Sequence, residues 1–366
     1  MINVLNIVDS LGTGGTEKVL INIISNTHKK VNHTIMIKNN DKNIYKEFLE
    51  KLNIQVIQAP PFSNYLKHYN FVKNYLKDNK ETIDLIHYYG GSLNYYLPIR
   101  LANKISIPVL IHSHNSQAAN KKLTNSHLLI RNFHNKYGKS YNIACSDEAG
   151  EWMFGNGEYD VVINGVDINF YEEGSKQGNE IRKNIFPSNS IVLGNFGRFN
   201  RQKNQKYLIN FLSSIHKKGY DNYYLLLIGE GELESELKSL VHNLNLENFV
   251  KIIGFQKNIE EYYGTIDAFF MSSIFEGLPL VLIEAQSVGV PILVSDNVDK
   301  TIKINNNIDF FGLEDQFDET FNKLKNILSQ GNQKSILYGG QFDVKVMSKK
   351  ILDLYLKILK EDSSNI

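Results

Sequence analysis

The feature that most constrains this chain is a regular alternation of short apolar runs with longer amphipathic segments, which repeats in two successive series. Short runs that are apolar on both faces are typical of parallel strands covered by helices on both sides. Their alternation with helical segments favours parallel α/β units. Because a single hydrophobic core stops growing near ~250–300 residues, a chain of 366 residues is expected to fold as two such domains.

The two series predict where the strands and helices lie. The first series begins with a strand at 4–8, a glycine-rich turn at 12–15 and a helix at 17–25. Its later strands are expected at 34–37, 55–58, 85–87, 109–112, 142–144 and 161–163. The second series has expected strands at 191–196, 224–228, 250–253, 268–271 and 291–294, and expected helices at 204–217, 232–244, 259–263 and 279–287. Polar residues and glycines between 167 and 190 predict the boundary between the domains.

Charge and cysteine content exclude several classes of protein. The formal net charge is +1, so the chain as a whole does not indicate a nucleic-acid partner. The one cysteine, Cys145, cannot form an internal disulfide, which is typical of a reducing compartment such as the cytoplasm. We expect no signal peptide, because the first ten residues lack a basic region, and no spanning helix, because no sufficiently long apolar run occurs.

Two glutamates flank a predicted helix start in the segment 275–284. Pro279 suits the first helical turn, where its missing N–H costs nothing, so Glu276 is expected just before the helix and Glu284 within it. A helix N-terminus that follows a strand can bind phosphate through its free N–H groups. The glutamates would then accept hydrogen bonds from the neutral hydroxyls of a sugar or ribose. On spacing alone, two ordinary surface glutamates remain an alternative.

A basic loop, residues 197–204, follows the first strand of the second series. Ligands of open α/β sheets bind beyond the carboxyl ends of the strands, so Arg198 and Lys203 could neutralise a diphosphate there. A solvated basic loop is the alternative. A weaker turn at 229–232, with Gly229, has the composition of a strand-to-helix turn.

The first series carries a glycine-rich turn and a histidine-bearing strand. The turn at 12–17 resembles a dinucleotide fingerprint only in part, because Glu17 stands where a third glycine is required. Strand alternation places His112 and His114 on one face, and the further ligands of a zinc site are missing from the sequence. There is also no Asp-x-Asp pair to hold a metal on a diphosphate.

Taken together and in this order, these motifs resemble glycosyltransferase family 4. The matching segments are 14–17, 112–114, 144–146, 164–167, 197–204, 229–231, 254–255 and 276–284, so the resemblance spans almost the whole chain. It implies the GT-B fold, with two Rossmann-like domains facing across a cleft. Residues 1–168, with a helix at 344–366 that crosses back, would form the acceptor-binding domain, and 169–343 the donor-binding domain.

The resemblance also implies roles for individual residues. Arg198 and Lys203 would bind the donor diphosphate and stabilise the departing nucleotide. Glu284 would bind the ribose hydroxyls, Glu276 the transferred sugar, and His114, which matches better than His112, would be the histidine of the cleft. Further donor contacts are implied for Gly14, Gly15, Gly229, Phe255, Gly277, Leu278 and Leu280.

The implied activity is a retaining, metal-independent transfer of a hexose or N-acetylhexosamine from a nucleotide sugar, most commonly a UDP-sugar, without a cofactor. The acceptor would be a glycan or a polyprenyl-linked sugar in bacterial surface polysaccharide synthesis. Two alternatives stay open at this point. One is a sugar-nucleotide epimerase of the same fold, and the other is a non-catalytic subunit that binds sugar nucleotides.

Residues 120–140 form a basic segment with interleaved apolar residues and no acidic residue. Its basic residues are Lys121, Lys122, Arg131, Lys136 and Lys139. A basic amphipathic helix can lie on an anionic membrane surface, which would bring a cytoplasmic enzyme to a lipid-linked acceptor. A solvated helix that covers the core is the alternative.

Overall fold

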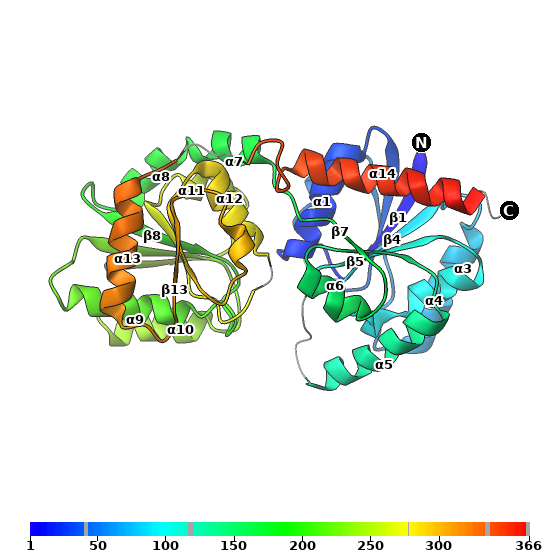
Figure 1. Cartoon of the computed structure of the whole chain (residues 1–366), viewed down its shortest axis with the longest axis horizontal. Coiled ribbons are helices and arrows are strands. Elements are labelled where there is room, and N and C mark those ends of the chain that lie inside the picture. Colours follow the sequence, from blue (N-terminus) through cyan, green and yellow to red (C-terminus); the bar gives the residue numbers. More distant parts are fainter. Residues whose placement is uncertain (40–42, 116–120, 277, 334–336, 364–366) are drawn as a thin grey trace. The chain divides into compact units, whose positions relative to one another are not determined.

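The computed structural model describes residues 1–39, 43–115, 121–276, 278–333 and 337–363 (Figure 1). The chain divides into two compact units. The first comprises Met1–Gly165 and Val344–Ile366, and the second comprises Val166–Asp343. None of the helices in the described residues combines the length and the apolar composition needed to cross a bilayer.

The described residues of the first unit form a parallel sheet with the strand order β3-β2-β1-β4-β5-β6-β7. The strands are β1 (Ile2–Val8), β2 (Val31–Ile37), β3 (Gln55–Gln58), β4 (Leu85–Gly90), β5 (Val109–Ser113), β6 (Tyr141–Ala144) and β7 (Asp160–Val161). The helices are α1 (Gly15–Thr27), α2 (Lys46–Lys51), α3 (Tyr65–Asp78), α4 (Leu97–Lys104), α5 (Lys121–Tyr137), α6 (Asp147–Phe154) and α14 (Val344–Ser363), with a 3-10 turn η1 (Leu93–Tyr95).

The described residues of the second unit form a parallel sheet with the order β10-β9-β8-β11-β12-β13. The strands are β8 (Ile191–Phe196), β9 (Tyr223–Ile228), β10 (Val250–Ile253), β11 (Ala268–Met271), β12 (Ile292–Ser295) and β13 (Ile308–Phe311). The helices are α7 (Ile168–Ser175), α8 (Gly178–Ile185), α9 (Gln205–His216), α10 (Glu234–Asn243), α11 (Ile259–Tyr263), α12 (Leu280–Val288) and α13 (Phe317–Gln330), with a 3-10 turn η2 (Lys300–Ile302).

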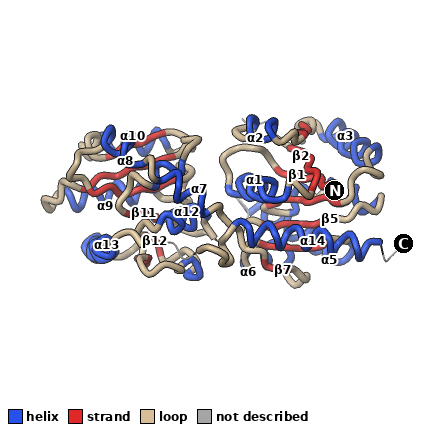
Figure 2. Tube along the Cα trace, turned by 90° about the horizontal axis from the view of Figure 1, so that it is seen from above, coloured by secondary structure: helices blue, strands red, loops and turns tan. Residues whose placement is uncertain are grey.

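Each sheet lies between helices, as Figure 2 shows. This arrangement buries both faces of the central strands, and β4, β5 and β11 are buried along their whole length. The C-terminal helix α14 packs on α1 and so belongs to the first unit. The predicted α/β class, with two parallel sheets and a C-terminal helix that returns to the first half, is confirmed.

Some predicted boundaries are wrong in detail. Pro279 lies before α12 rather than in its first turn, because its ψ of 116° is extended. Proline restricts φ alone, so the missing N–H does not force the residue into the helix. In the first unit, α1 starts at Gly15, earlier than the predicted 17, and β7 is limited to Asp160–Val161.

Both sheets have a point where the strand order reverses, between β1 and β4 in the first unit and between β8 and β11 in the second. Helix crossovers leave in opposite directions from such a pair of strands, so a crevice opens at their carboxyl ends. The loops that follow these strands are therefore the natural places for a site in each unit.

Candidate functional site

The predicted basic loop and the predicted glutamate segment meet at the reversal point of the second sheet. β8 and β11 pair directly, through Ala268 with Leu193 and Phe269 with Gly194. The loop after β8 carries Arg198 and Lys203, and the loop after β11 carries Glu276. Segments more than 70 residues apart in the sequence, such as residues 202 and 275, are thus neighbours at one edge of one sheet.

Backbone and amide hydrogen bonds join these two loops. The N–H of Ile274 donates to the carbonyl of Gln202 at 2.8 Å, and the Gln202 side chain donates to the carbonyl of Phe275 at 3.1 Å. The hydroxyl of Ser272 donates to the carbonyl of Asn204 at 2.9 Å. These bonds hold the two loops together, so the positions of Lys203 and Glu276 depend on each other.

Gly229 supports the basic loop from the neighbouring strand. A Cβ atom at this position would lie 2.0 Å from the carbonyl oxygen of Gly197. Only glycine permits such a close backbone approach. The N–H of Phe199 donates to the carbonyl of Glu230 at 2.9 Å, which continues the contact between the two loops. The structure thus gives Gly229 a role in positioning the basic loop, independent of any ligand.

Lys203 and Glu276 form an ion pair in which Nζ lies 2.7 Å from Oε1. Their side chains are only 17% and 11% exposed, so the pair is largely removed from water. Removing one partner of such a pair leaves an uncompensated charge that is poorly solvated. Arg198, by contrast, is exposed and forms no ion pair with any residue that the structure describes. Lys203 is therefore paired within the unit, whereas Arg198 faces solvent.

Glu284 lies in α12 and is 2% exposed. Its Oε2 accepts a hydrogen bond of 2.7 Å from the hydroxyl of Tyr263, which ends α11. A buried carboxylate requires such partners, because burial removes it from water. The interpretation of Glu276 and Glu284 as ordinary surface residues is therefore wrong.

The remaining predicted residues of this unit lie around the same edge of the sheet. Leu278 is half-buried and Leu280, the first residue of α12, is buried. Phe255 follows β10 and is half-buried. Gly277, for which a backbone contact was predicted, lies outside the described residues.

In the first unit, the predicted histidines belong to a cluster of packed rings that no local sequence motif predicts. The rings of His112 and His114 lie 4.0 Å apart between centroids, which confirms that the two side chains share one face. His87 from β4 contacts His112, with Nε2 and Nδ1 3.3 Å apart, and Tyr355 from α14, whose hydroxyl lies 2.6 Å from Nδ1. Tyr89 stacks on His87 with centroids 4.0 Å apart.

Burial keeps this cluster uncharged. It lowers the pKa of His114 to about 3 and holds the pKa values of His87 and His112 well below the ordinary range of imidazole. Both ring nitrogens of His114 are buried and have no hydrogen-bond partner among the residues that the structure describes. Nδ1 of His112 contacts His87, but its Nε2 is also buried without a hydrogen-bond partner among the described residues, so both histidines have unused hydrogen-bonding capacity and His114 has more of it.

The glycine-rich turn ends at the start of α1. Gly14 is the residue before the helix and Gly15 is its first residue. The hydroxyl of Ser10 donates to Oε1 of Glu17 at 2.9 Å, which closes the turn. The first N–H groups of a helix lack intrahelical acceptors, so this end of α1 can receive an anion.

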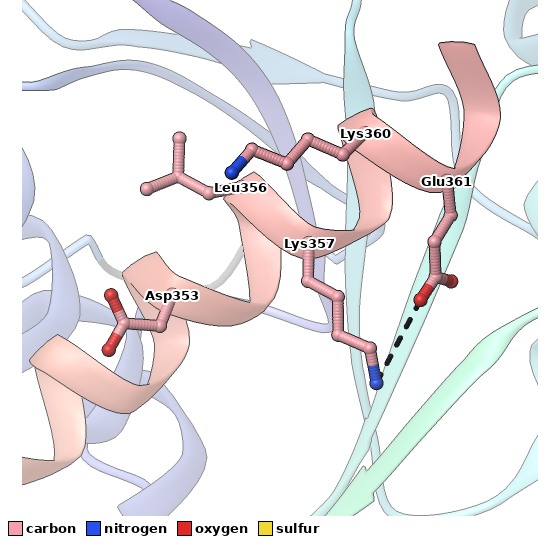
Figure 3. A pocket seen from close by; sticks show the side chains of 5 residues that line it. All are labelled: Asp353, Leu356, Lys357, Lys360 and Glu361. Carbon is pink, nitrogen blue, oxygen red and sulfur yellow. Dashed lines mark ion pairs between the residues drawn. The ribbon is translucent and has the colours of Figure 1, made fainter. Parts of the chain in front are cut away.

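Two further observations bear on where ligands can bind. Within the described ranges, no group of three or more His, Cys, Asp or Glu side chains is placed to hold a metal ion. A shallow hollow along α14 is lined by Asp353, Leu356, Lys357, Lys360 and Glu361 (Figure 3). This hollow contains none of the residues that the sequence singles out.

Sequence reasoning missed Tyr263, His87 and Tyr355. Tyr263 contacts Glu284 and His87 contacts His112, each from another element, whereas Tyr355 contacts His87 from 268 positions away in the sequence. The sequence carries a weak signal for Tyr263, since it ends a predicted helix that lies between two predicted strands. Nothing in its local pattern connects it with Glu284.

Comparison with known proteins indicates the class of reaction. The family model for "Glycosyl transferases group 1" matches residues 176–309. The EpsF protein of Bacillus subtilis, named as a glycosyltransferase, is 27% identical over 312 residues, which is 82% of this chain and 80% of EpsF. The Escherichia coli UDP-Gal:alpha-D-GlcNAc-diphosphoundecaprenol alpha-1,3-galactosyltransferase is 29% identical over 212 residues, 54% of each chain.

The fold has solved counterparts. The crystal structure of HepE from Anabaena, in complex with UDP and glucose, superposes with a TM-score of 0.80 over 97% of this chain and 99% of that one, at 20% identity. This likeness establishes the GT-B fold. Together with the family match and the relatives, it leads to one conclusion: the chain is a glycosyltransferase.

Proposed function

We propose that this glycosyltransferase transfers a hexose or N-acetylhexosamine from a UDP-sugar to a glycan or polyprenyl-linked acceptor, with retention and without a metal ion. The observation that carries the proposal is the Lys203–Glu276 pair at the reversal point of the second sheet, with buried Glu284 in the adjoining helix. The pair sets a cation and a carboxylate side by side, and a sugar diphosphate needs both.

The donor fits this arrangement by charge. Arg198 and Lys203 would bind the diphosphate, and the backbone N–H groups of Leu278, before α12, and of Leu280, at its start, would face the distal phosphate, as the sequence also predicts for Gly277. When the diphosphate binds, Lys203 exchanges Glu276 for a phosphate oxygen. Glu276 is then released to accept hydrogen bonds from sugar hydroxyls, while Glu284 accepts them from the ribose.

The other predicted contacts complete the donor site. Phe255 would pack against the nucleobase, and Gly229 would hold the basic loop in place. In the first unit, the residues that would take part are Gly14, Gly15 and His114, and that unit would bind the acceptor. Uracil as the base is supported by HepE, solved with UDP, and by the relative named for UDP-Gal.

The proposed reaction needs no protein nucleophile. The bond between the anomeric carbon and the distal phosphate oxygen breaks, and its electron pair stays on the phosphate. The acceptor hydroxyl attacks from the same face, and its proton passes to that phosphate oxygen, which gives retention. Arg198 and Lys203 stabilise the charge that develops on the leaving group, which is the largest catalytic term available here. These two cations, and the lack of an Asp-x-Asp pair in the sequence, support metal independence.

The acceptor setting is proposed from a relative and from α5. The Escherichia coli relative is named for a diphosphoundecaprenol acceptor, which favours a lipid-linked acceptor and a role in bacterial surface polysaccharide synthesis on the cytoplasmic side of the membrane. Helix α5 reverses the usual pattern of burial, because polar side chains are buried and apolar ones are exposed. His127 and His134 are buried, whereas Leu129, Phe133 and Tyr137 are 74%, 48% and 63% exposed. Exposed apolar side chains beside lysines suit an anionic membrane surface.

A flotation assay with anionic vesicles tests this surface. Changing Lys121, Lys122 and Lys136 to Ser should release the protein from the vesicles. Arg131 is left in place because it donates to the carbonyls of Glu151 and Trp152 at 3.2 and 3.1 Å and therefore supports the fold. Unchanged flotation of the triple variant would reject the membrane surface and leave α5 as a solvated helix.

A donor panel tests the proposed function itself. UDP-glucose, UDP-galactose, UDP-N-acetylglucosamine and GDP-mannose are each screened by thermal shift, since selective binding stabilises the folded state. We expect stabilisation by UDP-sugars and slow release of UDP and free sugar, detected by mass spectrometry, with product anomers assigned by NMR. An isomerised donor would instead identify an epimerase, and binding without any turnover a non-catalytic subunit.

A further inference from the structure

The second unit contains a tyrosine that is completely buried and points its hydroxyl at the carboxylate of Glu284. The hydroxyl of Tyr263 lies 2.7 Å from Oε2 of Glu284, and the tyrosine is 0% exposed. We infer that Tyr263 is a positioning residue, which holds the Glu284 carboxylate in the orientation that recognises the ribose hydroxyls of the donor. This inference rests on the proposed function, because it assigns ribose binding to Glu284.

The tyrosine ring is held on several sides by other aromatic rings. Its centroid lies 4.9 Å from that of Phe196, 5.6 Å from that of Tyr171 and 6.0 Å from that of Phe269. The first two contacts are edge-on, a favourable geometry for aromatic pairs. A ring packed in this way cannot rotate without displacing β8, β11 or α7, so the position of its hydroxyl is set by the core.

The backbone that carries Tyr263 is equally constrained. Gly264, the next residue, packs against α7 so closely that a Cβ atom there would lie 1.9 Å from the carbonyl oxygen of Ser175. At Gly178 a Cβ atom would lie 2.4 Å from the carbonyl carbon of Gly264. This contact fixes α11 against α7 and α8, and with it the reach of Tyr263 toward α12.

The hydroxyl is also chemically suited to this role. Burial, followed by the nearby Glu284, raises the pKa of Tyr263 well above its ordinary value, so the phenol keeps its proton and donates it. A hydrogen bond to a carboxylate is stronger than one between neutral groups. The carbonyl of Val281, at 3.2 Å, is a second and longer acceptor for the same hydroxyl. The shorter contact to Glu284 is therefore the stronger of the two hydrogen bonds.

Tyr263→Phe removes the hydroxyl and keeps the ring, and thus tests the inference directly. Binding of UDP and of 2′,3′-dideoxyuridine diphosphate is measured by titration calorimetry for the wild type and the variant. The wild type should bind UDP about tenfold more tightly, as expected for lost hydrogen bonds to a charged group. Tyr263→Phe should lose most of that preference and bind the dideoxy compound as the wild type does. In turnover, KM for the UDP-sugar should rise while kcat stays within about twofold.

The matched control is Tyr207→Phe, which removes a hydroxyl from a half-buried tyrosine of the same unit. That hydroxyl pairs with Oγ1 of Thr320 at 3.2 Å, on the α9 and α13 side of the unit. The control should keep the full preference for UDP. A double variant with Glu284→Gln should show no more loss than Glu284→Gln alone, since Tyr263 acts through Glu284.

The possible outcomes separate the inference from the proposed function. If the wild type prefers UDP and Tyr263→Phe keeps that preference, the inference is wrong and the proposed function stands. If the wild type binds neither compound, or both equally, the assigned donor site is wrong and the inference falls with it. Should Tyr263→Phe fail to fold, Phe196→Leu, which keeps the hydroxyl but loosens the packing of the ring that carries it, is measured instead and should lose part of the preference for UDP.

Discussion

The two units stabilise the polar side chains of their candidate sites in opposite ways. In the first unit, the rings of His87, His112 and His114 pack against one another and are kept neutral by burial. In the second, Lys203 and Glu276 are charged and compensate each other at 2.7 Å. The charged groups lie in the unit proposed to hold the diphosphate, where charge must be met by charge. We therefore expect acid to lower the stability of the first unit, and removal of Lys203 or Glu276 to impair the function of the second.

The largest expected effect comes from breaking the pair in the second unit. Lys203→Ala removes the cation proposed to face the leaving group and leaves Glu276 poorly solvated and unpaired. Turnover should fall on the order of 10²–10³-fold, measured as kcat at saturating UDP-sugar. Lys206→Ala is the matched control, because Lys206 is 61% exposed and lies 3.9 Å from Glu236. If both variants lose turnover equally, the pair has no special role.

Removing the other partner should separate binding from turnover. Glu276→Gln keeps the shape but not the charge, so kcat should fall about 10- to 100-fold through weaker contact with the sugar. UDP itself should bind about two- to fivefold more tightly, because Lys203 no longer has a competing carboxylate. Calorimetry with UDP and steady-state kinetics give the two readings. If Glu276→Gln kept the kcat of the wild type at saturating donor, the assignment of the transferred sugar to Glu276 and of the ribose to Glu284 would be wrong.

The first unit should be destabilised by acid. Folded His114 has a pKa of about 3, and an unfolded histidine titrates near ~6.5. The unfolded state therefore binds more protons between these values, and stability falls as the pH drops from about 6.5 toward 3. His114→Phe should make this slope shallower by about 1.4 kcal/mol per pH unit.

The single tryptophan, Trp152, lies in α6 of the first unit, so its fluorescence during urea unfolding reports on that unit. His242→Asn, at an exposed histidine of the second unit, is the control and should leave the slope unchanged. An equal slope for wild type and His114→Phe would mean that the folded histidine titrates normally.

The smallest expected effect concerns the link between the histidine cluster and the C-terminal helix. Tyr355→Phe removes the hydroxyl that lies 2.6 Å from Nδ1 of His87. The free energy of unfolding of the first unit should fall by about 1 kcal/mol, again followed through Trp152. Tyr338→Phe, at a tyrosine of the second unit that is 44% exposed, should not change it. A loss larger than that of a single hydrogen bond would indicate that α14 detaches.

Local pattern was sufficient for much of the fold. The strand at 191–196 and the helix at 259–263 are found where they were predicted, because a period of apolar residues is a property of the segment itself. The start of α12 was misplaced by one residue, because Pro279 is compatible with both extended and helical ψ values.

By itself, the sequence determined the α/β class, the order of the elements and which charged residues are candidates for the site. It could do so because periodicity and spacing are properties of a single segment. Only the tertiary structure decided which groups meet. It paired Lys203 with Glu276 across two loops, Glu284 with Tyr263 across two helices, and His87 with Tyr355 across most of the chain. These contacts depend on which strands become neighbours in a sheet and on how closely helices pack, and no local spacing encodes either.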